Sequence, residues 1–174
     1  MSDLVGDMLK ARGNLKIPAV QADATSLPFG DSSVDRIVVR QGLHYLDTGK
    51  ALKEFARVAQ SIALGHIVMQ SPEDLTVWRR YFQIASPGRR EVFERGAIEG
   101  VLRSSGFHVE HVVTRQSLAR IGDSIKHLDG SSRHAALKVF TDAPEEFKDR
   151  YGINGEVTVE DTYTMLWEFI VARP

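Results

Sequence analysis

The sequence predicts a single α/β domain (residues 1–174) built on a doubly wound, mostly parallel sheet. Two observations carry this prediction: apolar, β-branched segments alternate with amphipathic segments of helical period, and Gly, Pro, Asn or Ser residues separate them. A chain of 174 residues is also long enough to bury one substantial core. Alternation of this kind is typical of a sheet covered by helices on both faces.

The expected elements follow from local patterns along the chain. Residues 34–39 form a β-branched run typical of a buried strand. Apolar positions in 48–60 recur at helical spacing, and either Asp47 or Thr48 can act as the N-cap. The other expected elements are a helix at 4–12, strands at 17–21, 65–69 and 107–114, helical cap elements at 73–105 (as 73–85 and 92–105) and 116–150, and an antiparallel closing strand at 162–172.

Composition excludes several classes of protein. A net charge of −1 and a pI near 6.6 provide no electrostatic basis for binding nucleic acid or an anionic membrane. No apolar run reaches the ~20 residues of a membrane span, and the chain contains no cysteine for a disulfide or a thiolate ligand. No metal site is expected, since His108 and His111 should lie on opposite faces of a strand. A cytoplasmic protein is the simplest expectation.

The candidate binding site follows from the predicted sheet. In doubly wound domains, ligands bind beyond the carboxyl ends of the strands. The loops after Val20, Val39 and Met69 are therefore expected to form the site.

Several stretches, in this order and spacing, resemble class I S-adenosylmethionine-dependent methyltransferases, most closely the branch that acts on ubiquinone and menaquinone precursors and other small molecules. The resemblance implies a Rossmann-like fold with sheet order 3-2-1-4-5-7-6, S-adenosylmethionine as cofactor and a small-molecule acceptor. The stretches are Asp3-Leu4 through Ala11-Arg12, Ala22-Asp23-Ala24 with Leu27-Pro28-Phe29, Val34-Asp35, 41–45, 51–58 and 99–107.

The resemblance also implies cofactor-binding residues. Asp3 corresponds to the carboxylate that binds the ribose hydroxyls, Asp23 to the carboxylate near the adenine amino group, and Ala24 to the residue whose N–H faces the adenine ring. Asp23 has an alternative interpretation as a turn or N-cap residue, and Asp3 as part of a frayed terminus.

Three further candidates follow the expected strand at 34–39. The resemblance implies that Arg40, Gln41 and His44 lie beside the sulfonium of the cofactor and the acceptor, with Arg40 and Gln41 as cofactor-binding residues and His44 as a possible catalytic base. His44 has an alternative interpretation as a structural histidine whose hydrogen bonds are satisfied.

One departure from the family pattern is large. The family places a Gly-x-Gly turn after its first strand, whereas no two glycines of this sequence are separated by a single residue. The first strand and its helix have no counterpart, so the strand near Val38 should have an unpaired, apolar edge. Three solutions are open: the two flanking strands pair directly, a second copy pairs at the edge, or a different subunit supplies the missing half.

These observations lead to a conditional functional prediction. We expect a methyltransferase-like protein whose cofactor site needs a homo-oligomeric or heteromeric methyltransferase partner. A catalytically inactive pseudo-methyltransferase that acts as a binding or regulatory subunit is the first alternative. A small-molecule binding protein with a pocket under the helices of 73–105 is the second.

Overall fold

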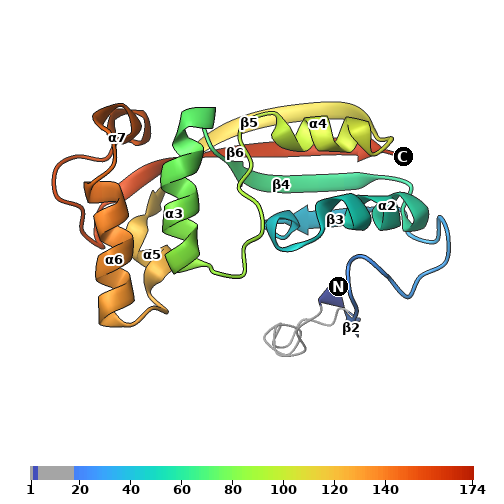
Figure 1. Cartoon of the computed structure of the whole chain (residues 1–174). Coiled ribbons are helices and arrows are strands. Elements are labelled where there is room, and N and C mark those ends of the chain that lie inside the picture. The colour runs from blue at the N-terminus through green and yellow to red at the C-terminus, as the bar shows by residue number, and fades with distance from the viewer. Residues whose placement is uncertain (1, 4–17) are drawn as a thin grey trace.

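A four-stranded sheet in the order β3-β4-β6-β5 runs through the middle of the computed structural model, which describes residues 2–3 and 18–174 (Figure 1). β3 and β4 are parallel, and β6 is antiparallel to both of its neighbours. The prediction of an antiparallel C-terminal strand in a mostly parallel sheet is therefore confirmed. The strands are β3 (Ile37–Arg40), β4 (Ile62–Val68), β5 (His108–Arg120) and β6 (Thr162–Arg173).

A second, two-stranded sheet lies apart from the first (Figure 1). It pairs β1 (Ser2–Asp3) with β2 (Val20–Gln21) in parallel. Within the described residues the two sheets share no strand pair, so the expected strands flanking the gap have not paired with each other. The expected helix at 4–12 lies outside the described residues.

Two helices cover one face of the main sheet. α2 (Thr48–Val58) begins at Asp47, whose side chain accepts a hydrogen bond from the Lys50 N–H, so one of the two expected N-caps is confirmed. α4 (Ala97–Ser104) lies on the same side, and Gly106 follows it with φ +90°, a value that favours glycine. The first core lies between these helices and the sheet and contains Leu52, Phe55, Val58, Ile62, Leu64, Ile98, Leu102 and Ile170.

The remaining helices gather at one end of the sheet (Figure 1). They enclose a second core that combines six aromatic side chains with aliphatic ones, and its largest fully buried member is Trp78. Here α3 packs against α6, while α7 and α5 contact β6 and β5 respectively. These elements are η2 (Pro72–Asp74), α3 (Leu75–Ala85), α5 (Ile121–Ile125), α6 (Gly130–Thr141) and α7 (Glu145–Tyr151).

The structure differs from two of the helical segments expected at 73–105 and 116–150. Residues 116–120 belong to β5 rather than to a helix, because they pair with residues 162–166 of β6. α4 starts at Ala97 instead of residue 92, and residues 86–96 form a loop along the end of the sheet.

The prediction that His108 and His111 lie on opposite faces of their strand is wrong. A β-bulge between Val109 and His111 places His108 and His111 opposite Arg173 and Val171, and thus on one face of the strand.

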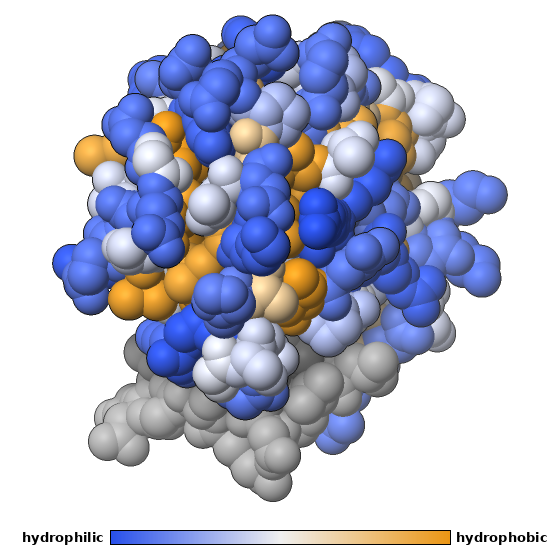
Figure 2. Space-filling view, turned by 60° about the vertical axis from the view of Figure 1, so that its left-hand side comes forward, coloured by the Kyte–Doolittle hydropathy of each residue, from blue (hydrophilic) through white to orange (hydrophobic). Residues whose placement is uncertain are grey.

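Among residues 2–3 and 18–174, no helix covers the second face of the main sheet at β3. Val38 is 71% exposed, and Phe169 and Val113 are about 40% exposed. The Ile37 N–H donates to the Ser61 carbonyl immediately before β4, and the Gln41 N–H donates to Gly65 within β4. The backbone groups of Val38 and Arg40 therefore point to the free edge, where no described strand pairs with them. Figure 2 shows apolar side chains reaching the surface on the face that it draws. In the described part of the chain, β3 therefore has an open edge, and the sheet has a partly uncovered apolar face.

Candidate functional site

Buried polar side-chain atoms without a hydrogen-bond partner are concentrated at the carboxyl end of β3 and in the segments next to it. Of ten such side-chain atoms in the described part of the chain, six belong to Gln41, His44, Thr48 and Arg89. Gln41 also has φ +53°, which is unusual for a residue other than glycine. Because an unpaired buried polar group costs about 1–3 kcal/mol, a cluster of them indicates a place where a bound molecule can supply the missing partners.

Two histidines form the centre of this cluster. His44 belongs to η1 (Leu43–Tyr45), and His66 lies on β4; both side chains are only 2% exposed. His44 Nδ1 and His66 Nε2 are 2.8 Å apart, and His66 Nδ1 is 2.7 Å from the carbonyl oxygen of Ile67. The carboxyl end of β4 thus holds a hydrogen-bonded chain of two imidazoles and a carbonyl.

The hydrogen-bond chain determines which ring nitrogens carry protons. The Ile67 carbonyl can only accept, so His66 Nδ1 carries the hydrogen and His66 Nε2 is an acceptor. His44 Nδ1 must then donate to His66, which leaves the lone pair of His44 Nε2 without a partner. Burial, with the positive charge of Arg89 next in importance for His44, lowers the pKa of His44 to about 3. Burial likewise lowers the pKa of His66 to about 4, so both rings are neutral at physiological pH.

Arg89 lies beside this pair. The N–H of Arg90 donates to the His44 carbonyl oxygen at 2.8 Å, which holds the loop containing Arg89 against η1. The Arg89 guanidinium lies 3.8 Å over the centre of the Phe82 ring, and its Nε and Nη1 atoms are buried without partners. Burial lowers the pKa of this group to about 10, which still leaves it charged at neutral pH.

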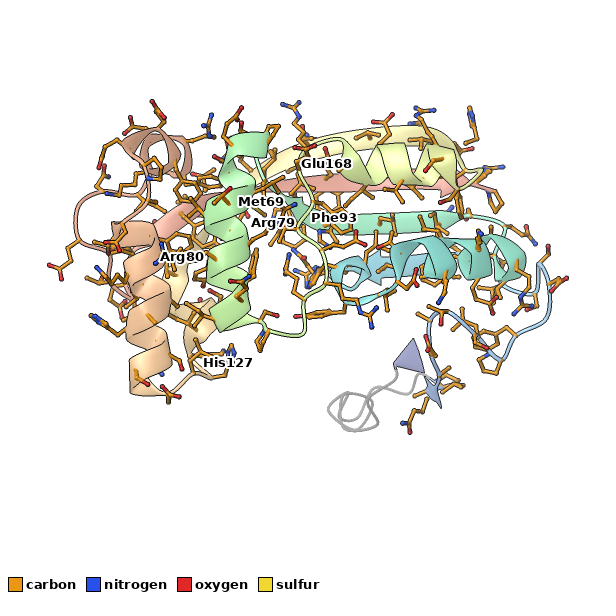
Figure 3. All side chains as sticks on the ribbon, viewed as in Figure 1. Met69, Arg79, Arg80, Phe93, His127 and Glu168 are labelled. Carbon is orange, nitrogen blue, oxygen red and sulfur yellow. The ribbon has the colours of Figure 1, made fainter. Side chains whose placement is uncertain are left out.

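A cleft opens next to Arg89. It has a volume of about 430 Å³, within the range of small-molecule pockets, and lies between η1, the C-terminal end of α3 and the turn after α5. Figure 3 shows His127 at this end of α3, where its Nε2 lies 3.1 Å from the carbonyl oxygen of Ala85. The aromatic side chains that line the cleft are Tyr45, Tyr81 and Phe82.

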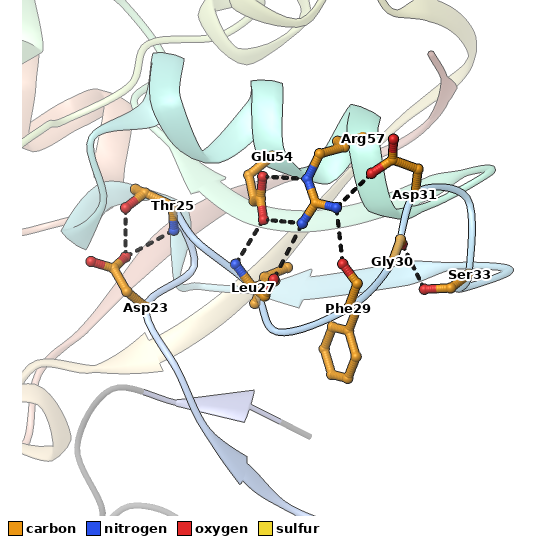
Figure 4. A network of polar contacts seen from close by, with 9 residues as sticks. All are labelled: Asp23, Thr25, Leu27, Phe29, Gly30, Asp31, Ser33, Glu54 and Arg57. Atoms are coloured by element: carbon orange, nitrogen blue, oxygen red, sulfur yellow. Dashed lines mark hydrogen bonds and ion pairs between the residues drawn. The ribbon is translucent and has the colours of Figure 1, made fainter.

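The loop after β2 forms a separate polar network (Figure 4). Asp23 accepts hydrogen bonds from both the N–H and the hydroxyl of Thr25, each at 2.8 Å. Farther along, Arg57 binds Glu54, Asp31 and the carbonyl oxygens of Phe29 and Leu27. The loop from Asp23 to Asp31 is thereby tied to α2.

Comparison with known proteins agrees with this architecture. Residues 2–64 match the family model described as "Methyltransferase domain". A demethylmenaquinone methyltransferase of Mycolicibacterium paratuberculosis is 34% identical over 93 residues, which are 49% of this chain and 40% of that protein. The chain therefore spans less than half of the length of that curated relative.

Solved structures extend the match over the whole chain. A candidate methyltransferase of Bacillus halodurans superposes with a TM-score of 0.85 at 17% identity, covering 99% of this chain and 80% of the other. The chain has the class I methyltransferase fold. A complex between the Haloferax volcanii Trm112 methyltransferase activator and a candidate methyltransferase matches this methyltransferase fold with a TM-score of 0.60 at 17% identity, covering 99% of this chain and 70% of the other.

Three of the predicted site residues lie in the N-terminal part of the chain, near β1 and β2. The backbone of Asp3 pairs with Gln21 across β1 and β2. Asp23 is exposed, and its hydrogen bonds to Thr25 lower its pKa, so it serves as a turn residue in this structure. The Ala24 N–H makes no hydrogen bond within the described part of the chain and remains available.

The other three predicted residues follow β3. Gln41 and His44 belong to the cluster of unpartnered buried atoms, whereas Arg40 lies on the opposite face of the sheet, 5.3 Å from the Trp167 ring centre. The structure thus brings His44 and Gln41 to the carboxyl end of the sheet and separates Arg40 from them. His66 and Arg89 were missed. His66 is a polar side chain within the otherwise apolar sequence of β4, and this local exception was the signal that could have indicated a functional role.

The residues present fit only one part of the cofactor that this methyltransferase fold uses. The free Ala24 N–H and the Asp23 carboxylate suit the adenine edge. The Gly-x-Gly turn that would let backbone approach the methionine part is absent from the 174 residues. Along the described residues, no group of His, Asp and Glu side chains could hold a metal ion, and no helix is long and apolar enough to span a membrane.

Replacing Arg57 with lysine is expected to loosen the loop at 27–31 with little effect on global stability. Lysine cannot bind two carboxylates and two carbonyls at once, but the Arg57 side chain is 36% exposed, so solvent screens its ion pairs and the expected loss of global stability is small. Amide hydrogen exchange should become faster at 27–31 and stay unchanged in α3. Equal exchange in Arg57→Lys and the parent would contradict the assigned role.

Mild acid is expected to destabilise the protein through the histidine pair. The folded-state pKa values of about 3 and about 4 lie below the ordinary 6.5, so the unfolded chain binds protons that the folded chain does not. The contribution of the two neutral histidines to the free energy of unfolding is fully present above pH 6.5 and is lost as the pH falls toward 4. Between pH 8 and 5.5 the free energy of unfolding should fall by an amount on the order of 2 kcal/mol. Urea unfolding across this range measures it.

The variant that tests the role of the histidine pair in this pH dependence combines His44→Gln with His66→Gln. This double variant should have a flatter pH profile than the parent whatever its absolute stability, and the exposed His134→Gln should keep the parent's slope. Burial raises the pKa of Glu168, which acts in the opposite direction, because its stabilisation is lost as pH rises. The slope difference between parent and double variant therefore isolates the histidines. Identical slopes would refute the assignment.

Proposed function

We propose that this chain forms the acceptor-side part of an S-adenosylmethionine-dependent methyltransferase that methylates a small molecule. We propose further that a strand, a glycine-rich turn and a helix from a partner subunit pair with β3 and complete the cofactor site. The open edge of β3 is the single observation that carries the proposal. One strand inserted between the two sheets would join them in the order of the family that the sequence resembles.

The exposed face supports the same conclusion. Val38, Phe169 and Val113 form an apolar surface that a helix following the inserted strand would cover. The demethylmenaquinone methyltransferase relative supports a small-molecule acceptor. The activator complex among the structural relatives is a precedent for a methyltransferase that works with a partner.

In this arrangement the chain's own residues have defined tasks. Asp23 and Ala24 bind the adenine edge, and Gln41 lies between the cofactor side and the acceptor side. His44 presents a neutral, unpartnered Nε2 that can accept a hydrogen bond from an acceptor molecule and so orient it. S-adenosylmethionine, when bound, supplies the methyl group.

Calorimetry with S-adenosylmethionine tests the proposal. The isolated chain is expected to show no binding at 100 µM cofactor, and a complex with a partner that carries Gly-x-Gly should bind at micromolar strength. The product of a neighbouring reading frame is the first partner to test, and solution mass shows whether a second copy takes this place. Micromolar binding by the isolated monomer would contradict the partner requirement.

Val38→Pro locates the contact on β3. The Val38 N–H points away from β4, so proline removes one donor from the free edge and keeps the β3–β4 ladder. Association with the partner should weaken at least tenfold, while Val38→Thr should associate like the parent. Equal association of both variants would place the partner elsewhere.

A non-catalytic binding or regulatory subunit is the second candidate, favoured by the missing Gly-x-Gly turn. It predicts that the complex forms through β3 but does not bind S-adenosylmethionine at this chain's loops. Asp23→Ala in the assembled complex separates the two functions. A drop in cofactor affinity supports the enzyme, and unchanged affinity supports the regulatory subunit.

A further inference from the structure

A second cleft, which we call the arginine cleft, adjoins the one beside His127. It has a volume of about 390 Å³, lies between α3 and the loop at 87–92, and shares Phe82, Pro87 and Arg89 with the first cleft. The charged residues that line it are Arg79, Arg89, Arg90 and Glu91. Three cations and one anion give the arginine cleft a net charge of +2, although the whole chain carries −1. The positive charge is therefore concentrated locally.

The three arginines of this cleft have no counter-ion from the chain itself. Elsewhere, Arg57 pairs with Glu54 and Arg150 pairs with Asp74. Within residues 2–3 and 18–174, the side chains of Arg79, Arg89 and Arg90 form no ion pair and no hydrogen bond. Three like charges in one cleft repel each other, so an anion from outside the chain would be attracted to it.

Arg89 is held in position before any ligand binds. Its guanidinium stacks on the Phe82 ring at 3.8 Å, and its N–H donates to the Ser86 carbonyl at 2.9 Å. The loop is fixed again one residue later, where the Arg90 N–H donates to the His44 carbonyl at 2.8 Å. Arg89 Nε and Nη1 are buried, whereas Nη2 is neither buried nor hydrogen-bonded within the described chain. Arg89 thus offers an accessible donor on a fixed group, which loses little side-chain entropy on binding.

The charge and the lining of the arginine cleft indicate the class of ligand. A dianion neutralises a net charge of +2, and a phosphate monoester carries about two negative charges at pH 7. Guanidinium groups suit phosphate oxygens because they present several N–H donors in one plane. Phe82, Pro87 and Val92 add an apolar wall, which favours a phosphate attached to a small apolar body. A sulfate ester or a single carboxylate carries one charge and would leave part of the positive charge uncompensated.

We propose that the arginine cleft binds a small phosphate monoester, with Arg79, Arg89 and Arg90 around the phosphate group and Phe82 against the apolar part. This inference goes beyond the proposed function. None of the residues given a task in methyl transfer lines this cleft, and the ligand is neither the cofactor nor the methyl acceptor. Binding needs neither S-adenosylmethionine nor a partner subunit.

Three probes test the proposal by calorimetry on the full chain at about pH 7 without cofactor. Phenyl phosphate presents a dianion on a ring, phenyl sulfate has nearly the same shape with one charge, and inorganic phosphate has no ring. We expect phenyl phosphate to bind at least about tenfold more tightly than either of the others, because only it satisfies both the charge and the apolar wall. Its affinity should fall as sodium chloride is added. The Nε–H resonance of Arg89 should shift on binding.

Two single variants locate the phosphate group. Arg79→Gln and Arg90→Gln each remove one cation from an exposed position, so both should fold like the parent. Each should bind phenyl phosphate roughly fivefold or more weakly than the parent. Arg80→Gln is the matched control and should bind like the parent, because Arg80 is the adjacent exposed arginine of α3 and does not line the arginine cleft (Figure 3).

Several results would overturn the proposal. Equal affinities for phenyl phosphate and phenyl sulfate, no binding at millimolar concentration, or an unchanged Arg89 resonance would each do so. Parent-like affinity in Arg79→Gln and Arg90→Gln, or an equal loss in Arg80→Gln, would show that the arginine cleft is not the site. Inorganic phosphate that binds as tightly as phenyl phosphate would contradict the role of the apolar wall. No measurement here involves S-adenosylmethionine or a partner, so failure of this inference is distinguishable from failure of the proposed function.

Discussion

Replacing Trp78 with alanine is expected to lower the free energy of unfolding by about 3–5 kcal/mol, the range for truncating a large buried aromatic side chain. Trp78 is 2% exposed. Six aromatic rings have their centres within 5.9 Å of its own ring; they are Tyr81, Phe82, Phe140, Phe147, Tyr151 and Tyr163. These rings come from α3, α6, α7 and β6, so the cavity would loosen the whole helical end of the sheet.

Trp167→Ala is the matched control, because Trp167 is the other tryptophan and lies half-buried on the open sheet face. It should lose less than half as much stability in urea unfolding followed by far-UV circular dichroism. Trp78→Phe keeps part of the volume and should still fold if alanine does not. Equal losses for the two alanine variants would show that the aromatic core does not depend on Trp78.

Replacing Asp74 with alanine is expected to cost about 2–4 kcal/mol, because it leaves buried donors without an acceptor. Asp74 is 1% exposed and accepts from the Ser71 N–H at 3.0 Å, from the Tyr151 hydroxyl at 2.9 Å and from Arg150 Nε at 3.1 Å. The carboxylate thus connects the start of α3 to α7, which lies more than seventy residues later.

A double-mutant cycle tests this role. Tyr151→Phe removes one of the donors, so Asp74→Ala should cost less in that background than in the parent. Asp74→Asn keeps an acceptor oxygen and should lose less stability than Asp74→Ala. Purely additive effects of Asp74→Ala and Tyr151→Phe would contradict the proposed connection. Urea midpoints with unchanged m-values provide the measurement.

Local patterns predicted most of the fold. The helical spacing of Ala51, Leu52 and Phe55 after Asp47 predicted α2 and its cap, and the closing strand was predicted within a residue of β6. The second half of β5 was missed, because most of residues 116–120 are exposed and show no apolar alternation. They form a strand only because β6 pairs with them, and a partner far along the chain leaves no local signal.

The residues of the candidate site likewise fall into those that the sequence indicated and those that only the structure revealed. The order of short motifs around Asp23, Gln41 and His44 was sufficient by itself to indicate a class I methyltransferase, and the absent Gly-x-Gly pattern indicated what is missing. Only the tertiary structure brought His66, 22 residues later, into hydrogen-bonding distance of His44, and Arg89 beside them. The hydrophobic period and the turn-forming residues are local properties that can be recognised directly in the sequence. Proton positions and unsatisfied buried groups depend on which distant strands and loops come into contact, so they exist only in the folded chain.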